Sequence, residues 1–143
     1  MGAVCYYDQM ILPSDKEILA FHKEHAPSKR AFEVVYTHCQ IISDVALRLA
    51  SATHLQVDVH FVHVAALLHD VGYYSLYDET GQYVPGALLI THGVVGAELL
   101  RNAGMPEAIC RVAERHTGVG LTKEYILKTH LPLPPNDYVA ETT

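Results

Sequence analysis

Four histidines and one aspartate are spaced along the sequence so that helices could bring them together. His38 lies on the edge of a strongly periodic segment, His69 and Asp70 follow an apolar run, and His92 and His116 lie at the ends of later helical segments. Imidazole and carboxylate are ligands that divalent first-row metals accept, and mixed His/Asp sets are typical of open catalytic sites. A lone histidine on an apolar face is more often a core residue, so the prediction of metal chemistry depends on the whole set.

Helices are the elements that must position these residues. Ser14-Asp15-Lys16-Glu17 has the capping-box pattern, so a first helix is expected to begin there and to end at Pro27. Ser28 can cap a second helix. Its apolar residues recur in steps of three and four and predict one buried stripe: Phe32, Val35, Cys39, Ile42, Ala46 and Leu49. His38 lies beside this stripe and is expected to face inward or along the edge of the core.

A third helix is expected after Asp58, over VHFVHVAALLHD, with His69 at its last core position and Gly72 as its terminator. A Tyr- and Gly-rich loop follows. Three further helices are expected to begin at Thr91, Pro106 and Thr122. The short gaps and the absence of alternating strand patterns predict an all-α, single-domain bundle of about six helices. The domain is expected to span residues 1–143, with its core at about 14–130 and a Pro-rich tail at 131–143.

Composition narrows the classes of function. Half of the 143 residues are apolar, and 16 acidic against 10 basic residues leave a net charge of −6, which argues against a nucleic-acid platform but not against a small phosphorylated substrate. Three cysteines without a CxxC pair indicate a reducing compartment. The sequence shows no signal peptide and no run of about 20 apolar residues, so a cytoplasmic protein without a membrane segment is expected. The Tyr-rich segments could serve a homodimer.

The wider pattern resembles a known family. A helical His38 followed by ALLHDVG, THGVVGAELL and ERHTG is similar in order and spacing to the HD superfamily, in particular its small HDIG-type proteins, from roughly His38 to Tyr138. The resemblance implies that His38, His69 and Asp70 ligate a first metal and that His92 and His116 hold a second. It implies one or two divalent ions, Fe, Mn, Zn, Ni or Co, with Mg less expected.

The sequence departs from the family pattern at two places where relatives have a charged residue. The family ends in a distal Asp that completes the site, but this sequence stops at Glu141-Thr142-Thr143, and Asp137 lies in a Pro-rich segment where it is not expected to replace that ligand. Whether the chain is catalytically competent without the distal Asp stays open.

The second departure is the pair Tyr73-Tyr74, which stands where many relatives have Lys or Arg. The charge that neutralises a phosphate would then come from Lys123 or Arg115. Arg111 is expected to be solvated or in an ordinary ion pair. The remaining histidines are expected at the surface: His22, His25, His54, His60, His63 and His130.

The resemblance implies a metal-dependent phosphohydrolase. Asp70 would ligate metal and orient a metal-activated water, which hydrolyses a phosphomonoester or phosphodiester, with a nucleotide as the first expectation. Two alternatives stay open. Some proteins with this pattern are dinuclear iron oxygenases, and a degenerate HD domain could be a non-catalytic module that binds a nucleotide or a partner.

Overall fold

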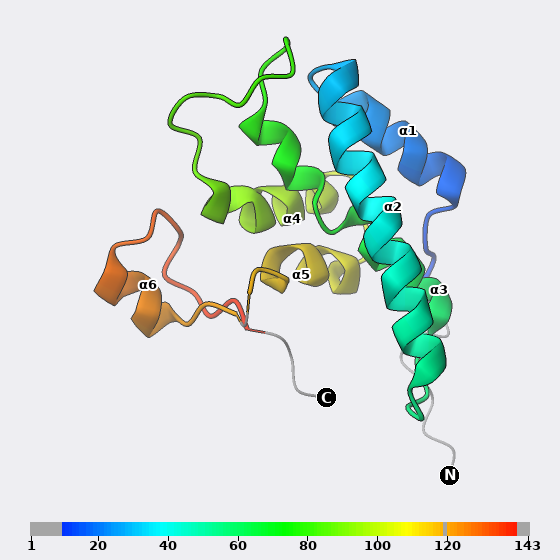
Figure 1. The fold of residues 1–143 in the computed structure, drawn as a ribbon. Coiled ribbons are helices and arrows are strands. Elements are labelled where there is room, and N and C mark those ends of the chain that lie inside the picture. The colour runs from blue at the N-terminus through cyan, green and yellow to red at the C-terminus, as the bar shows by residue number, and fades with distance from the viewer. Residues whose placement is uncertain (1–9, 119, 140–143) are drawn as a thin grey trace.

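The computed structural model describes residues 10–118 and 120–139, which form α-helices and short 3-10 helices (Figure 1). The elements are α1 (Asp15–His25), α2 (Lys29–Ala52), α3 (Val59–Leu68), η1 (Val71–Leu76), η2 (Leu89–Thr91), α4 (His92–Asn102), α5 (Glu107–Arg115) and α6 (Lys123–Thr129). Within the described ranges the only β-pairing is two isolated bridges, Tyr77 with Tyr83 and Leu121 with Tyr138. The predicted all-α fold with six helices is confirmed. None of the described helices is long and apolar enough to cross a membrane.

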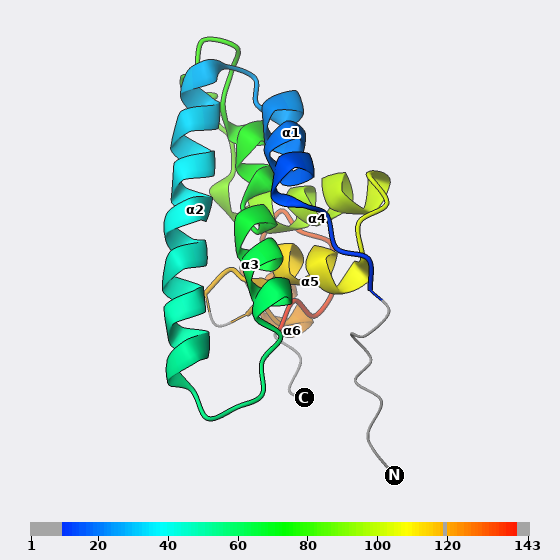
Figure 2. The same ribbon diagram turned by 90° about the vertical axis from the view of Figure 1, so that its right-hand side faces the viewer.

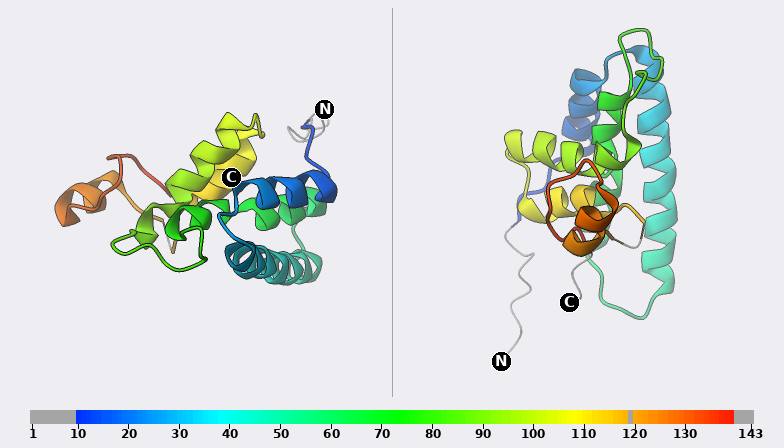
Figure 3. Two further views of the ribbon diagram at one scale, coloured as in Figure 1. Left: turned by 90° about the horizontal axis from the view of Figure 1, so that it is seen from above. Right: turned by 90° about the vertical axis from the view of Figure 1, so that its left-hand side faces the viewer.

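The helices form two groups that meet at η1. α1, α2 and α3 lie side by side, and α4 and α5 lie across them (Figure 2). α2 packs on α3, α4 packs on α5, and η1 packs against α4. α6 lies at the end of the molecule away from α1 and α2 (Figure 3). The main core joins α1, α3, α4 and α5 through buried side chains that include Ile18, Val64, Leu68, Leu100 and Ile109.

Local hydrogen bonds explain where several helices begin. Ser14 and Glu17 cap α1 reciprocally, as the capping box predicts. Ser28 accepts from the Ala31 N–H at the start of α2, and Thr122 accepts from the Tyr125 N–H at the start of α6. Thr91 does not cap α4, because the chain enters from η2 with Thr91 already in helical conformation and its hydroxyl donates to the Leu88 carbonyl instead.

The buried stripe of α2 differs from the predicted one at its C-terminal end. Val35 and Cys39 are buried, but Leu49 is 66% exposed. α2 has 24 residues and α3 only 10, so a helix of about 15 Å faces one of about 36 Å and leaves its end uncovered. His38 lies at the edge of the covered part, with 48% of its side chain exposed, in agreement with the expected edge position.

The sequence predicted that Gly72 ends α3, and this prediction is wrong. The helix ends at Leu68, and Gly72 lies inside η1. A Cβ at Gly72 would lie 1.9 Å from the His92 carbonyl oxygen and 2.5 Å from the Gly96 nitrogen. The residue is therefore needed for the close approach of two backbones, which holds η1 against the start of α4.

The prediction that His22 lies at the surface is wrong. His22 is fully buried on α1, beside Ile18 and Phe21. Its Nε2 lies 2.8 Å from the Leu67 carbonyl and its Nδ1 lies 2.7 Å from the Tyr74 hydroxyl. A carbonyl only accepts, so Nε2 carries the proton and Nδ1 accepts from the tyrosine. Burial lowers the pKa of His22 to about 4.

The other five histidines that were expected at the surface differ in how exposed they are. His54, His60 and His130 are exposed, as expected. His25 and His63 are half-buried. His63 connects three helices, because its ring bonds Ser43 on α2 and Asp15 on α1 at 2.8 and 2.9 Å.

The buried His22 predicts a pH-dependent stability. In the unfolded chain this histidine binds a proton below pH 6.5, whereas in the folded chain it stays neutral until about pH 4. The unfolded state therefore binds more protons in this window, and His22 lowers the free energy of unfolding by up to about 3 kcal/mol as the pH falls from 7 to 4. Urea unfolding of metal-free protein should show a shallower loss over this range for His22→Gln than for wild type. His60→Gln is the control, and an unchanged pH dependence in His22→Gln would contradict the assignment.

Candidate metal centre

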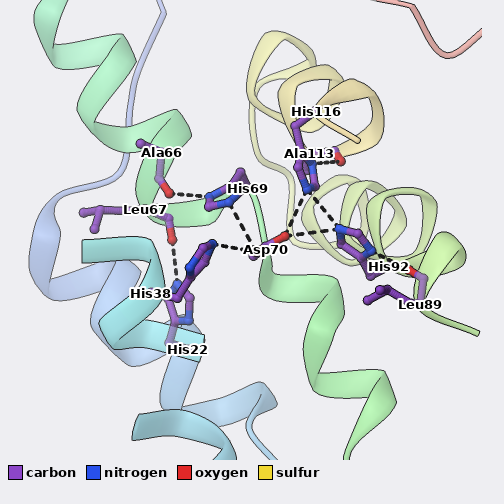
Figure 4. A network of polar contacts seen from close by, with 10 residues as sticks. All are labelled: His22, His38, Ala66, Leu67, His69, Asp70, Leu89, His92, Ala113 and His116. Atoms are coloured by element: carbon purple, nitrogen blue, oxygen red, sulfur yellow. Dashed lines mark hydrogen bonds and ion pairs between the residues drawn. The ribbon is translucent and has the colours of Figure 1, made fainter. Parts of the chain in front are cut away.

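All five predicted ligands meet around Asp70, where four helices converge (Figure 4). His38 projects from α2, and His69 and Asp70 follow the last residue of α3. His92 is the first residue of α4, and His116 follows the last residue of α5. Asp70, His69 and His92 are buried, whereas His38 and His116 are more exposed, so the site opens toward the latter two.

The carboxylate of Asp70 is divided between two pairs of imidazoles. Its Oδ2 lies 3.1 Å from His38 Nε2 and 3.3 Å from His69 Nε2. Its Oδ1 lies 3.3 Å from His92 Nε2 and 3.0 Å from His116 Nε2. Two sets of three ligand atoms result, each with its atoms within 4.8 Å of one another, and Asp70 belongs to both. One carboxylate could thus serve two ions, one on each oxygen.

Three of the rings are held in one tautomer by the backbone. Each Nδ1 lies close to the carbonyl oxygen three residues earlier: His69 to Ala66 at 2.7 Å, His92 to Leu89 at 2.5 Å and His116 to Ala113 at 2.7 Å (Figure 4). Since a carbonyl only accepts, Nδ1 carries the proton, and Nε2 of a neutral ring presents a lone pair. Metal-bound histidines are oriented by bonds of this kind.

This arrangement fits a cation. In neutral rings the negative lone pairs on Nε2 would face the negatively charged carboxylate oxygens of Asp70 and be repelled. In addition, Asp70 Oδ1 is buried without a hydrogen-bond donor. The Nε2 atoms of His92 and His116 lie 2.9 Å apart, which two lone pairs do not tolerate without a positive charge between them. The residues therefore need either extra protons or a metal ion, and their donor set suits a divalent transition metal.

When no metal is bound, a proton on His69 supplies positive charge beside Asp70 Oδ2. Burial is the largest single effect and disfavours a charged His69, but the hydrogen bonds to Asp70 and Cys39 and the charge of Asp70 together outweigh burial and raise the pKa of His69 to about 10. Burial alone would raise the pKa of Asp70, yet the rings of His116, His69 and His92 hold it well below its usual range. At pH 8 the metal-free site thus keeps an ionised Asp70 beside a protonated His69.

Metal binding is consequently expected to release protons. A metal-bound imidazole must be deprotonated at the ligating nitrogen, so His69 loses its Nε2 proton when metal binds at pH 8, and at least one proton per chain is released. Calorimetric titration of Mn²⁺ into metal-free protein, in two buffers with different ionisation enthalpies, measures this release as a difference in heat. Equal heats in the two buffers would contradict the assigned protonation state.

A cavity of about 470 Å³ opens onto this centre. Its lining consists of the five candidate ligands together with Tyr73, Leu89, Ile90, Thr117 and Gly118. We call it the metal cavity. Asp70 is its one acidic residue among the described parts of the chain.

Lys123 and Arg115, predicted to bind phosphate, do not line the metal cavity. Arg115 contacts the Val139 carbonyl at 3.4 Å and the carboxylate of Glu114 at 3.5 Å. The Lys123 backbone N–H donates to Asp137 at 2.8 Å, so the Asp137 carboxylate lies at the start of α6. In agreement with the sequence, Asp137 does not replace the distal ligand. Arg111 pairs with Glu107, as expected of an ordinary ion pair.

Tyr73 is a cavity residue that the sequence did not assign to the site. Its ring centre lies 4.5 Å from that of His92, and burial together with the charge of Asp70 raises the pKa of its hydroxyl. The signal available in the sequence was its position three residues after Asp70. Leu89 and Ile90 lie in the short η2, and Thr117 and Gly118 lie in the connection after α5, where residue types alone carry no such signal.

The chain matches one family model and several known proteins. The family model described as HD domain matches residues 35–140. An uncharacterized protein of Methanocaldococcus jannaschii is 41% identical over 113 residues, covering 77% of this chain and 59% of the relative. Two proteins named tRNA (cytidine(56)-2'-O)-methyltransferase, from Thermoplasma volcanium and Picrophilus torridus, are 35% and 33% identical over 78% and 92% of this chain.

This chain spans 29% and 33% of those two methyltransferases, and less than two thirds of all three relatives. Among solved structures, the HD domain of the L. monocytogenes phosphodiesterase PgpH superposes with a TM-score of 0.53 over 85% of this chain and 62% of that chain. At 22% identity that likeness concerns the fold.

Proposed function

The chain belongs to the HD domain family, and from this premise we propose that it is a metal-dependent phosphohydrolase with its active centre at Asp70. The observation that carries the proposal is the division of the Asp70 carboxylate between two pairs of imidazoles. We assign His38, His69 and Asp70 Oδ2 to one ion, and His92, His116 and Asp70 Oδ1 to another. Three protein ligands for each ion leave positions open for water and substrate.

When bound, such ions polarise a phosphoryl oxygen and lower the pKa of a bound water to near neutrality. The residues of this chain provide the rest. Asp70, which lines the metal cavity, would hold both ions and through them orient the attacking water. The buried rings of His69 and His92 are fixed by backbone carbonyls and keep the two ligand sets rigid. Leu89 and Ile90 contribute apolar lining to the metal cavity.

The donor set also bears on the identity of the metal. Imidazole with carboxylate suits Fe, Mn, Co, Ni or Zn, whereas Mg²⁺ prefers oxygen ligands and is less supported. No second carboxylate lines the metal cavity in the parts of the chain that the structure describes. Among the described lining residues, Asp70 is therefore the one source of negative charge at the proposed centre.

The activities named for the relatives are not part of this proposal. The two proteins named methyltransferase are about three times as long as the segment that matches, so the proposal does not carry their activity over to this chain. The proposed reaction is hydrolysis of a phosphomonoester or phosphodiester, with a nucleotide as the first candidate substrate.

The test is metal analysis combined with two assays. Protein purified without chelator is expected to contain up to two equivalents of transition metal per chain and to hydrolyse p-nitrophenyl phosphate or bis(p-nitrophenyl) phosphate without consuming oxygen. Oxygen uptake without phosphate release would instead support a dinuclear iron oxygenase. Binding of a nucleotide without turnover, with each of Mn, Fe, Co, Ni and Zn, would support a non-catalytic binding module.

A further inference from the structure

A second cavity of about 190 Å³ adjoins the metal cavity. Its lining is Val34, Val35, His38, Asp70, Tyr73 and Tyr77. We call it the side cavity. His38, Asp70 and Tyr73 line both cavities, so the two cavities meet at the candidate metal centre.

The far walls of the side cavity are apolar and aromatic. Val34 and Val35 come from α2, and Tyr77 comes from the end of η1. The Tyr77 ring is supported from the side by Tyr83, with ring centres 5.8 Å apart, and the Tyr73 ring rests on His92. These contacts hold the walls in place before any ligand arrives. A dry cavity of about 150 Å³ is known to accept benzene, so this volume suits one flat ring.

In the described parts of the chain, the side chains that line the two cavities carry no Lys or Arg charge, so a bound metal would be the source of positive charge there. A substrate with several phosphates would place further negative charges against Val34, Tyr77 or Leu89, where no described Lys or Arg of the lining compensates for lost hydration. A substrate with one phosphoryl group and an uncharged ring avoids this cost.

We propose that the side cavity binds an uncharged, flat substituent of the substrate, so that the preferred substrate is a phosphoester with one phosphoryl group and one ring system. A nucleobase or another aromatic group fits this description, and a polyphosphate does not. The inference rests on the proposed function only in placing the phosphoryl group at the metal centre. Val34 and Tyr77 are then specificity-determining residues, because they contact the substituent and not the reacting atoms.

Three phosphonates test the proposal, because they share a head group that is not hydrolysed. Calorimetric titration of the full chain loaded with Mn²⁺ should show phenylphosphonate binding about tenfold more tightly than methylphosphonate, because the ring buries apolar surface. 4-Carboxyphenylphosphonate should lose about that factor again, because its carboxylate would enter the side cavity.

Val34→Lys supplies a charge at the mouth of the side cavity and should reverse the order of the two aromatic phosphonates. Ile41→Lys is the matched control: it makes the same charge change on the same helix at a position that is 56% exposed, against 50% for Val34, and lines neither cavity. It should keep the wild-type order. Circular dichroism verifies that both variants fold.

The outcomes separate this inference from the proposed function. Equal affinities for phenylphosphonate and methylphosphonate would overturn the side-cavity assignment, even if the protein hydrolyses phosphoesters. The same holds if Val34→Lys and Ile41→Lys behave alike. Preferential binding of phenylphosphonate that Val34→Lys reverses supports the assignment, even if no phosphoester is hydrolysed and the proposed function fails.

Discussion

Asp70→Ala is expected to remove both metal ions and to lower turnover by at least about a thousandfold. Each oxygen of this carboxylate lies within 3.3 Å of two imidazole nitrogens, so one substitution takes a ligand from both sets. Removal of Asp70 also leaves four imidazoles without a negative charge to offset a divalent ion. Elemental analysis for metal per chain and a phosphoester assay measure the two effects together.

Two other variants make this expectation specific. His116→Ala removes a ligand from one set and should leave one equivalent of metal at the other. Asp137→Ala should keep both ions, because that carboxylate accepts a hydrogen bond from the Lys123 backbone and does not line the metal cavity. The fold should survive in Asp70→Ala, since the Asp70 side chain caps no helix. Two equivalents of metal in Asp70→Ala would refute the shared-carboxylate arrangement.

Gly72→Ala is expected to destabilise the protein by about 3 kcal/mol or more. The added Cβ would lie 1.9 Å from the His92 carbonyl oxygen and 2.5 Å from the Gly96 nitrogen, and both are backbone atoms in α4. Relief therefore requires η1 and α4 to separate. Because Asp70 precedes η1 and His92 begins α4, metal affinity should fall with stability.

Urea unfolding of metal-free protein gives the free-energy difference, and metal titration gives the effect on the site. Gly104→Ala is the control. Gly104 has a positive φ of 73° but nothing within 4 Å of its added Cβ, so the substitution should cost only about 1 kcal/mol. Equal losses for the two variants would show that the contact between η1 and α4 is not the cause.

The sequence by itself determined the helices and the identity of the candidate ligands. Ser14, Ser28, Asp58 and Thr122 each cap a helix through atoms no more than three residues away, so residue types at short spacing were sufficient. The candidate ligand set was predictable because few residue types bind transition metals. In addition, the order and spacing of His38, His69 and Asp70 resemble the pattern of the HD superfamily.

The tertiary structure decided the features that depend on distant segments. His22 contacts Leu67 and Tyr74 at separations of 45 and 52 residues, so its burial could not be read from the polarity of its own helix. The same is true of Gly72, whose role depends on where α4 crosses η1. Lys123 was predicted to bind phosphate because of its charge, but it does not line the metal cavity.

The division of one carboxylate between two pairs of rings, and the side cavity next to it, also arise only from the packing of α2, η1, α4 and α5. Capping and periodicity act within one or two helical turns, where spacing along the chain determines distance in space. The positions of helices relative to one another depend on how side chains from remote segments fit together, and that fit decides what the metal centre can bind.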